Sequence, residues 1–185
     1  MKAFVVYESM FGNTRRIAEA IASGLEIVGN VTVQCVTDTP AEVLFDTDLL
    51  VVGGPTHAHS WSSPTTRAEA AKLAADPNRA LSAEPNSTGQ GLREWVPALP
   101  FSRRLCAAFD TRADALRLLT GAAGVRIDKE LHKRGMRTVS PPASFLVDSA
   151  NSLLPGEEDR ARAWGLHVAV AADGDTYGKS VFSSV

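Results

Sequence analysis

Residues 2–25 read KAFVVYESMFGNTRRIAEAIASGL, and this stretch decides the fold. Its first part, 3–7, is a continuous apolar run with β-branched residues, as in a strand that is buried on both faces. A short polar loop with a single glycine follows. From residue 14 to residue 27, apolar side chains recur at helical spacing on one face. The stretch therefore predicts a strand, a tight polar loop and an amphipathic helix.

The alternation of strands and helices continues along the chain and predicts a layered α/β fold. Strands alternating with helices form a parallel sheet that is covered on both faces, here a three-layer sandwich with five strands. We expect one domain over residues 1–172, with an inserted loop at 76–90, and a flexible polar tail at 173–185. Further strands are expected at 31–37, 49–54, 103–109 and 136–147, the last bent at its two prolines, and further helices at 65–75, 91–99, 121–134 and 156–171.

Composition excludes several classes of function. The chain has 185 residues, a formal net charge of −2 and 44% hydrophobic residues, so neither a nucleic acid nor a membrane is an expected partner. No apolar run approaches the ~18 residues that span a bilayer. The N-terminus enters a strand directly, so we expect no signal peptide. Cys35 and Cys106 lie in strand-like runs without metal-ligand spacing. We expect a cytoplasmic protein without a metal site.

The polar loop after the first strand has the chemistry of a phosphate site. In a parallel sheet, ligands bind beyond the carboxyl ends of the strands, and the N-terminus of the next helix offers unpaired N–H groups to an anion. Ser9 and Thr14 add hydroxyl groups, and Gly12 permits close approach. The loop has neither a P-loop lysine nor a GxGxxG pattern, so it suits a monophosphate. The alternative is that Asn13 or Thr14 only caps the helix.

Three stretches resemble the flavodoxin-like family. YESMFGNT at 7–14 is similar to the family's phosphate loop, with Phe11 in place of the usual hydroxyl residue, as in the flavodoxin domains of flavodiiron proteins. VVGGPTHAHSWSSP at 51–64 resembles the end of the family's third strand and the flavin loop after it, and FDTR at 109–112 stands where its fourth-strand loop contacts the flavin. The resemblance implies FMN held without a covalent bond and a sheet with strand order 2-1-3-4-5.

The resemblance also implies that these three loops hold the cofactor. Trp61 would stack on the ring and the two loop histidines would contact its edge; the alternatives are a surface-loop anchor and solvated histidines. Phe109 is either a core residue or a ring contact. Arg112 would stabilise the anionic reduced flavin, or else pair with Asp110 or Asp114. The cofactor-binding candidates are Ser9, Met10, Phe11, Gly12, Asn13, Thr14, Pro55, Thr56, His57, Ala58, His59, Trp61, Phe109, Asp110, Thr111 and Arg112.

The flavin itself would carry the chemistry, which the resemblance identifies as electron transfer. The chain would then exchange electrons with a redox partner protein or a small-molecule acceptor. The alternatives are an NAD(P)H:quinone or flavin-reductase-type enzyme and a flavodoxin-fold binding module that has lost FMN. The nearly neutral charge is unusual for an acidic electron shuttle, and no nicotinamide fingerprint favours the enzyme. Cys106 and Arg112 have the C-x5-R spacing of phosphatase loops, but a cysteine inside a strand does not fit that chemistry.

Overall fold

A computed structural model of the chain describes residues 1–57, 60–79, 81–115 and 120–182, the last seven of these as backbone only. At its centre lies a parallel sheet with strand order β2-β1-β3-β4-β5, in which β6 also pairs with β4. This order confirms the prediction. The strands are β1 (Lys2–Tyr7), β2 (Asn30–Cys35), β3 (Leu49–Pro55), β4 (Leu105–Ala113), β5 (Arg137–Thr138) and β6 (Ala143–Val147).

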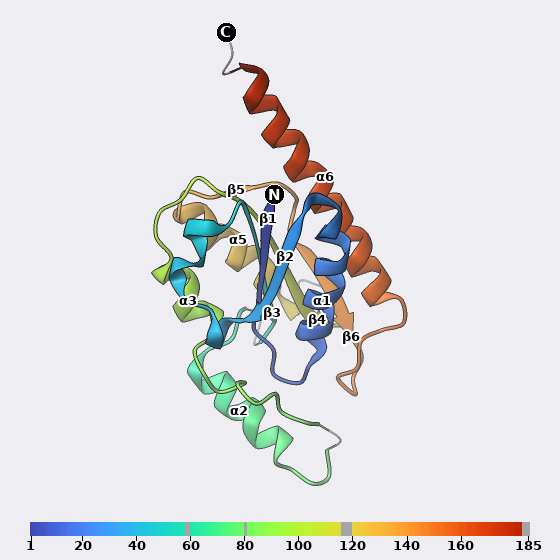
Figure 1. Cartoon of the computed structure of the whole chain (residues 1–185). Coiled ribbons are helices and arrows are strands. Elements are labelled where there is room, and N and C mark those ends of the chain that lie inside the picture. Colours follow the sequence, from blue (N-terminus) through green and yellow to red (C-terminus); the bar gives the residue numbers. More distant parts are fainter. Residues whose placement is uncertain (58–59, 80, 116–119, 183–185) are drawn as a thin grey trace.

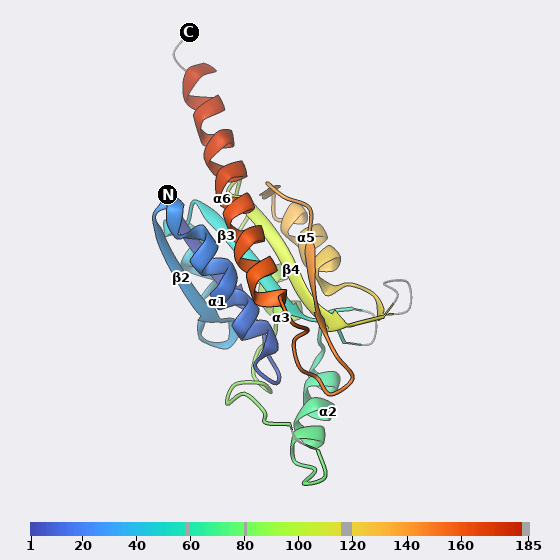
Figure 2. The same ribbon diagram turned by 90° about the vertical axis from the view of Figure 1, so that its right-hand side faces the viewer.

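Helices cover both faces of the sheet and make the expected three-layer sandwich (Figures 1 and 2). The helices α1 and α6 lie on one face, and α3 and α5 lie on the other. Strand residues alternate accordingly: Val5 and Val51 pack in the cluster under α1 and α6, whereas Val6 and Val52 pack in the cluster under α3 and α5. The helices are α1 (Asn13–Leu25), α2 (Pro64–Ala74), α3 (Leu92–Ala98), α5 (Ala123–Lys133) and α6 (Glu157–Phe182), with short 3₁₀ helices at Glu26–Val28, Val36–Asp38 and Ala41–Asp46.

The fifth strand is interrupted, as its two prolines predict, and forms the two pieces β5 and β6. Both pieces pair in parallel with β4, β5 opposite Leu105 and Cys106 and β6 opposite Phe109–Ala113. Pro141 and Pro142 lie between the pieces and lack the backbone N–H that a strand ladder needs. The pairing therefore stops at the prolines and resumes after them.

Two boundaries differ by more than two residues from those that the sequence predicts. The strand expected at 103–109 runs on to Ala113 as β4, because it pairs with β3 on one side and β6 on the other as far as that point. The helix expected to end at residue 171 continues as α6 to Phe182, through most of the expected tail (Figure 1). The flexibility of that tail stays a prediction. The 76–90 insertion and α2 project beyond the carboxyl ends of the strands (Figures 1 and 2).

Two glycines set the distance between α1 and α6. A Cβ atom at Gly24 would lie 2.1 Å from the carbonyl oxygen of Arg162, and one at Gly165 would lie 2.2 Å from the carbonyl oxygen of Ile21. Such distances leave no room for a side chain, so the two backbones cross in direct contact. A Cβ atom at Gly174, further along α6, would meet no described atom within 4 Å. Gly165 and Gly174 therefore differ in the space around them: Gly165 is packed against α1, whereas Gly174 is not.

We expect Gly165→Ala to lower the free energy of unfolding by about 1–3 kcal/mol, because the added methyl group must push α6 away from α1. The matched control Gly174→Ala adds the same methyl group to the same helix where space is open. It should leave stability unchanged or raise it by up to about 1 kcal/mol through helix propensity. Urea unfolding of both variants measures the difference. Equal stability of the two variants would contradict the close crossing.

Candidate functional site

The carboxyl ends of β1, β3, β4 and β6 border one cavity of about 340 Å³. Because the strands are parallel, these ends lie at the same edge of the sheet, where ligands bind in folds of this kind. The cavity lies beside the point where the chain order reverses, between β1 and β3. Its lining residues are Ser9, Met10, Phe11, Asn13, Thr14, Pro55, Thr56, His57, Thr111, Arg112, Ala113, Val147, Asp148, Ser149 and Asn151.

The loop between β1 and α1 is shaped as an anion cradle. Gly12 is the N-cap of α1 and has a φ of 89°, a left-handed conformation that favours glycine. Its N–H donates to the hydroxyl oxygen of Ser9 at 3.1 Å. The hydroxyl groups of Thr14 and Thr111 share a hydrogen bond of 2.7 Å, which ties α1 to the end of β4. No side chain caps α1, and Asn13 and Thr14 are its first helical residues, so neither is the capping residue of the alternative interpretation.

The 76–90 insertion contacts the loop between β1 and α1 from outside the cavity. The backbone N–H of Glu84 donates to the carbonyl oxygen of Met10 at 2.8 Å. Its carboxylate accepts from Nε of Arg15 at 3.1 Å and lies 3.0 Å from the point where a Cβ of Gly12 would stand. The acidic side chain is thus paired with a cation and does not line the cavity. The insertion closes the outer side of the loop.

A buried ionic network lies directly beneath the cradle. Glu8 precedes the loop and is only 4% exposed; its carboxylate accepts from the hydroxyl of Ser62 and, at 2.8 Å, from the N–H of Leu92. Arg67, also 4% exposed, donates to the Ser62 hydroxyl at 3.0 Å and to Glu94 at 2.9 Å. Burial raises the pKa of Glu8, against the opposing effects of Ser62, Leu92 and Arg67. The network joins β1 to the starts of α2 and α3.

His57 and Thr56, in the loop after β3, both line the cavity. The backbone of His57 exchanges two hydrogen bonds with Ser60, of 2.7 and 2.9 Å. Burial, with a smaller effect of the nearby Arg67 charge, lowers the pKa of the imidazole. The side chain is therefore neutral near pH 7. The other residues predicted in this stretch, Ala58 and His59, lie outside the described residues.

Besides Gly12 of the loop before α1, three predicted cofactor residues lie elsewhere than in the cavity wall. Trp61 packs into the core under the guanidinium of Arg93, whose Cζ lies 5.6 Å from the ring centroid. Phe109 is fully buried and meets Phe145 and Trp164 edge to face. Asp110 accepts a hydrogen bond of 2.7 Å from the backbone N–H of Gly124 at the start of α5.

These three placements give the side chains structural contacts in this structure. Their contact with a cofactor stays a prediction.

The loop after β6 also lines the cavity, although none of its residues is among the predicted site residues. The side-chain amide of Asn13 donates to the carbonyl oxygen of Asn151 at 2.7 Å, which joins this loop to the cradle. Asp148 accepts from the backbone N–H groups of Ala150 and Ser152 at 2.9 and 2.8 Å, which fixes the turn. The signal was present, because the loop follows the predicted strand 136–147 at the same edge of the sheet.

Arg112 brings a positive charge to the cavity. Its Nη1 donates to the carbonyl oxygen of Ala115 at 2.8 Å and to the hydroxyl of Thr120 at 3.2 Å. Its Nε is buried and has no hydrogen-bond partner among the described residues. The ion pairs of the described residues do not include Arg112, so the predicted pairing with Asp114 is not found there.

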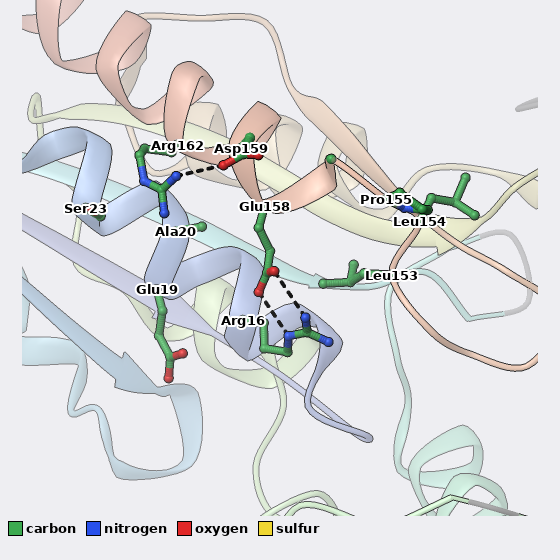
Figure 3. Close-up of a pocket in the computed structure, with 11 residues that line it drawn as sticks. Arg16, Glu19, Ala20, Ser23, Leu153, Leu154, Pro155, Glu158, Asp159 and Arg162 are labelled. Carbon is green, nitrogen blue, oxygen red and sulfur yellow. Dashed lines mark hydrogen bonds and ion pairs between the residues drawn. The ribbon is translucent and has the colours of Figure 1, made fainter.

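Two other features of the described part of the chain are less suited to a ligand or a reaction. A larger hollow of about 460 Å³ lies between α1 and α6 (Figure 3), but its charged side chains are paired, Arg16 with Glu158, Arg162 with Asp159, and Glu19 with Arg15. Burial raises the pKa of Cys106 to about 12, which is unsuited to a phosphatase nucleophile. Within the described ranges, no three metal-ligating side chains come together and no helix is long and apolar enough to cross a membrane.

Comparisons with known proteins agree with this geometry. Residues 5–84 match the family model for flavodoxin. No curated protein sequence matches the chain. The fold is similar to that of a flavodoxin from the domain Archaea (TM-score 0.64, 22% identity, 94% of this chain and 99% of that one) and of Flavodoxin 2 from Bacillus cereus (TM-score 0.64, 18%, 91% and 98%).

A further similar structure is the Flv1 flavodiiron core from Synechocystis, with a TM-score of 0.61 and 17% identity over 95% of this chain and 36% of that one. The sheet order and these structural similarities show that the chain has a flavodoxin-like fold. The family model for flavodoxin matches less than half of the chain.

The lowered pKa of His57 predicts a pH dependence of stability. Below the ordinary value of 6.5, the unfolded chain takes up a proton at this residue before the folded protein does. The wild type should therefore lose stability relative to His57→Gln as the pH falls through that value, by no more than about 1.4 kcal/mol per pH unit. Urea unfolding of both proteins at pH 7.5 and pH 5.5 measures the effect. The same difference at both pH values would show that the imidazole is freely solvated.

Proposed function

We propose that the cavity binds FMN without a covalent bond and that the chain is a cytoplasmic electron-transfer protein. The observation that carries the proposal is the cradle of Ser9, Gly12 and Thr14 at the start of α1, because it gathers hydroxyl groups and first-turn N–H groups where a phosphate dianion is favoured. The cavity, at about 340 Å³, is within the range of sites for small cofactors. The family match over residues 5–84 supports the same cofactor.

Different residues of the chain would hold different parts of FMN. The cradle would take the phosphate, and the ends of β3, β4 and β6 would surround the rest of the molecule, with His57 neutral and Arg112 charged. The carboxylate of Glu84 stands outside the cradle and is paired with Arg15, so it leaves the anion site open. FMN, when bound, supplies electron transfer through its ring system; the protein supplies binding and a fixed electrostatic environment.

The electrons would go to a redox partner protein or to a small-molecule acceptor. An FMN-dependent enzyme of the NAD(P)H:quinone or flavin-reductase type is the second candidate. The observation that favours it is the positive charge of Arg112 in the cavity wall together with the nearly neutral net charge of −2, since an acidic surface is what docks a shuttle on basic partners. A binding module without FMN is the third reading, and the experiment below tests it directly.

Thr14→Val should weaken FMN binding by about 10- to 150-fold. The valine keeps the shape of the side chain but removes a hydroxyl donor to a charged group, which contributes roughly 1.5–3 kcal/mol. Riboflavin, which lacks the phosphate, should bind the wild type far more weakly than FMN does, and the substitution should change its affinity by less than about twofold. Fluorescence titration with both flavins measures the four dissociation constants.

Thr111→Val serves as the matched control, because it breaks the same hydroxyl–hydroxyl bond but leaves the Thr14 hydroxyl in place. It should weaken FMN binding less than Thr14→Val. If riboflavin and FMN bind the wild type equally, the phosphate does not occupy the cradle. If neither flavin binds, the chain is a binding module of another kind.

A further inference from the structure

Arg112, which is half-buried, is held differently from the buried Arg67. Arg67 is buried together with two carboxylates, at 2.9 Å from Glu94 and 4.0 Å from Glu8. The guanidinium of Arg112 instead donates to neutral oxygen atoms, those of Ala115 and Thr120. The ion pairs of the described residues do not include it. A cation in a cavity wall that is not paired with a described carboxylate is suited to an anionic part of a ligand.

The direction of β4 separates this charge from the phosphate cradle. Successive strand residues point to opposite faces of a sheet. Thr111 faces α1, because its hydroxyl meets that of Thr14 in the cradle. Arg112 faces the other side, where it bonds to Ala115 and Thr120 ahead of α5. A ligand whose phosphate lies in the cradle would therefore present its other end to Arg112.

The described cavity wall carries two fixed charges, one of each sign. The negative one is the carboxylate of Asp148, which forms no ion pair with Arg112 and whose Oδ1 atom accepts two hydrogen bonds from its own loop after β6. His57 is neutral near pH 7 because burial lowers its pKa. Arg112 is therefore the one fixed positive charge among the described lining residues.

We infer that Arg112 is the residue that selects the reduced state of the flavin. The inference rests on the proposed binding of FMN. Two-electron reduction leaves the ring system with an extra negative charge near neutral pH, whereas the oxidised ring is neutral. A fixed guanidinium beside the ring stabilises the charged form and does little for the neutral one. The site would hold reduced FMN more tightly than an acidic site does, which shifts the potential upward and favours electron acceptors of quinone type.

The test compares the dissociation constants of oxidised FMN and of dithionite-reduced FMN, measured anaerobically by quenching of tryptophan fluorescence. Arg112→Gln should change the constant for oxidised FMN by less than about twofold and weaken reduced FMN by about tenfold, which is a potential shift of about 30 mV for a two-electron couple. Arg112→Lys keeps the charge and should restore most of the preference. Arg126→Gln, at an exposed position of α5, controls for the loss of one positive charge and should leave both constants unchanged.

Three other results would overturn the inference, and they can be told apart. If Arg112→Gln weakens both redox states of FMN equally and leaves riboflavin unaffected, the guanidinium binds the phosphate. If neither constant changes while the wild type binds FMN, Arg112 only shapes the strand end, and the proposed function stands without it. If the wild type binds FMN in neither redox state, both proposals are wrong. A thermal melt of each variant confirms that the comparison is made on folded protein.

Discussion

The hydrogen bonds that hold β1 between β2 and β3 fix the position of everything at the candidate site. These two ladders bring the end of β1 to the middle of the sheet, so the chain must leave it where the order of the strands reverses. The loop that follows turns at Gly12 and starts α1 at once. The N–H groups of a helix start therefore lie beside the ends of β3 and β4, an arrangement of topology and backbone that favours an anion.

The side-chain contacts around this cradle depend on particular residues of this sequence and do not follow from the topology. Glu8, Ser62 and Arg67 tie the end of β1 to α2, and Glu84 of the insertion braces the loop from outside. A buried ion pair adds little net stability, because loss of hydration offsets the attraction. Its effect here is geometric: the segments from β3 to α3, including the insertion, are anchored to the residue that precedes the cradle. The insertion is thus part of the site's framework.

Local sequence patterns predicted the fold well. They could not predict which side chains meet when they are far apart in the sequence. Buried runs such as LLVVGG at 49–54 and the strand–loop–helix start gave the element order, and the family resemblance gave the sheet order. The pattern could not show that β4 runs on through Thr111 and Arg112, because that depends on partners on both sides. The burial of Trp61 and the network of Glu8 with Arg67 join residues far apart in sequence, so spacing carries no signal for them.

The most direct test of the account is a visible-absorption titration of FMN with the purified protein, freed of any flavin beforehand. The account predicts a saturable change in the flavin absorption bands at one FMN per chain. It also predicts that FMN, but not riboflavin at the same concentration, co-elutes with the protein on gel filtration, because the phosphate in the cradle supplies the difference. A flavin spectrum unchanged by excess protein, with FMN eluting alone, would contradict the assignment of the cavity.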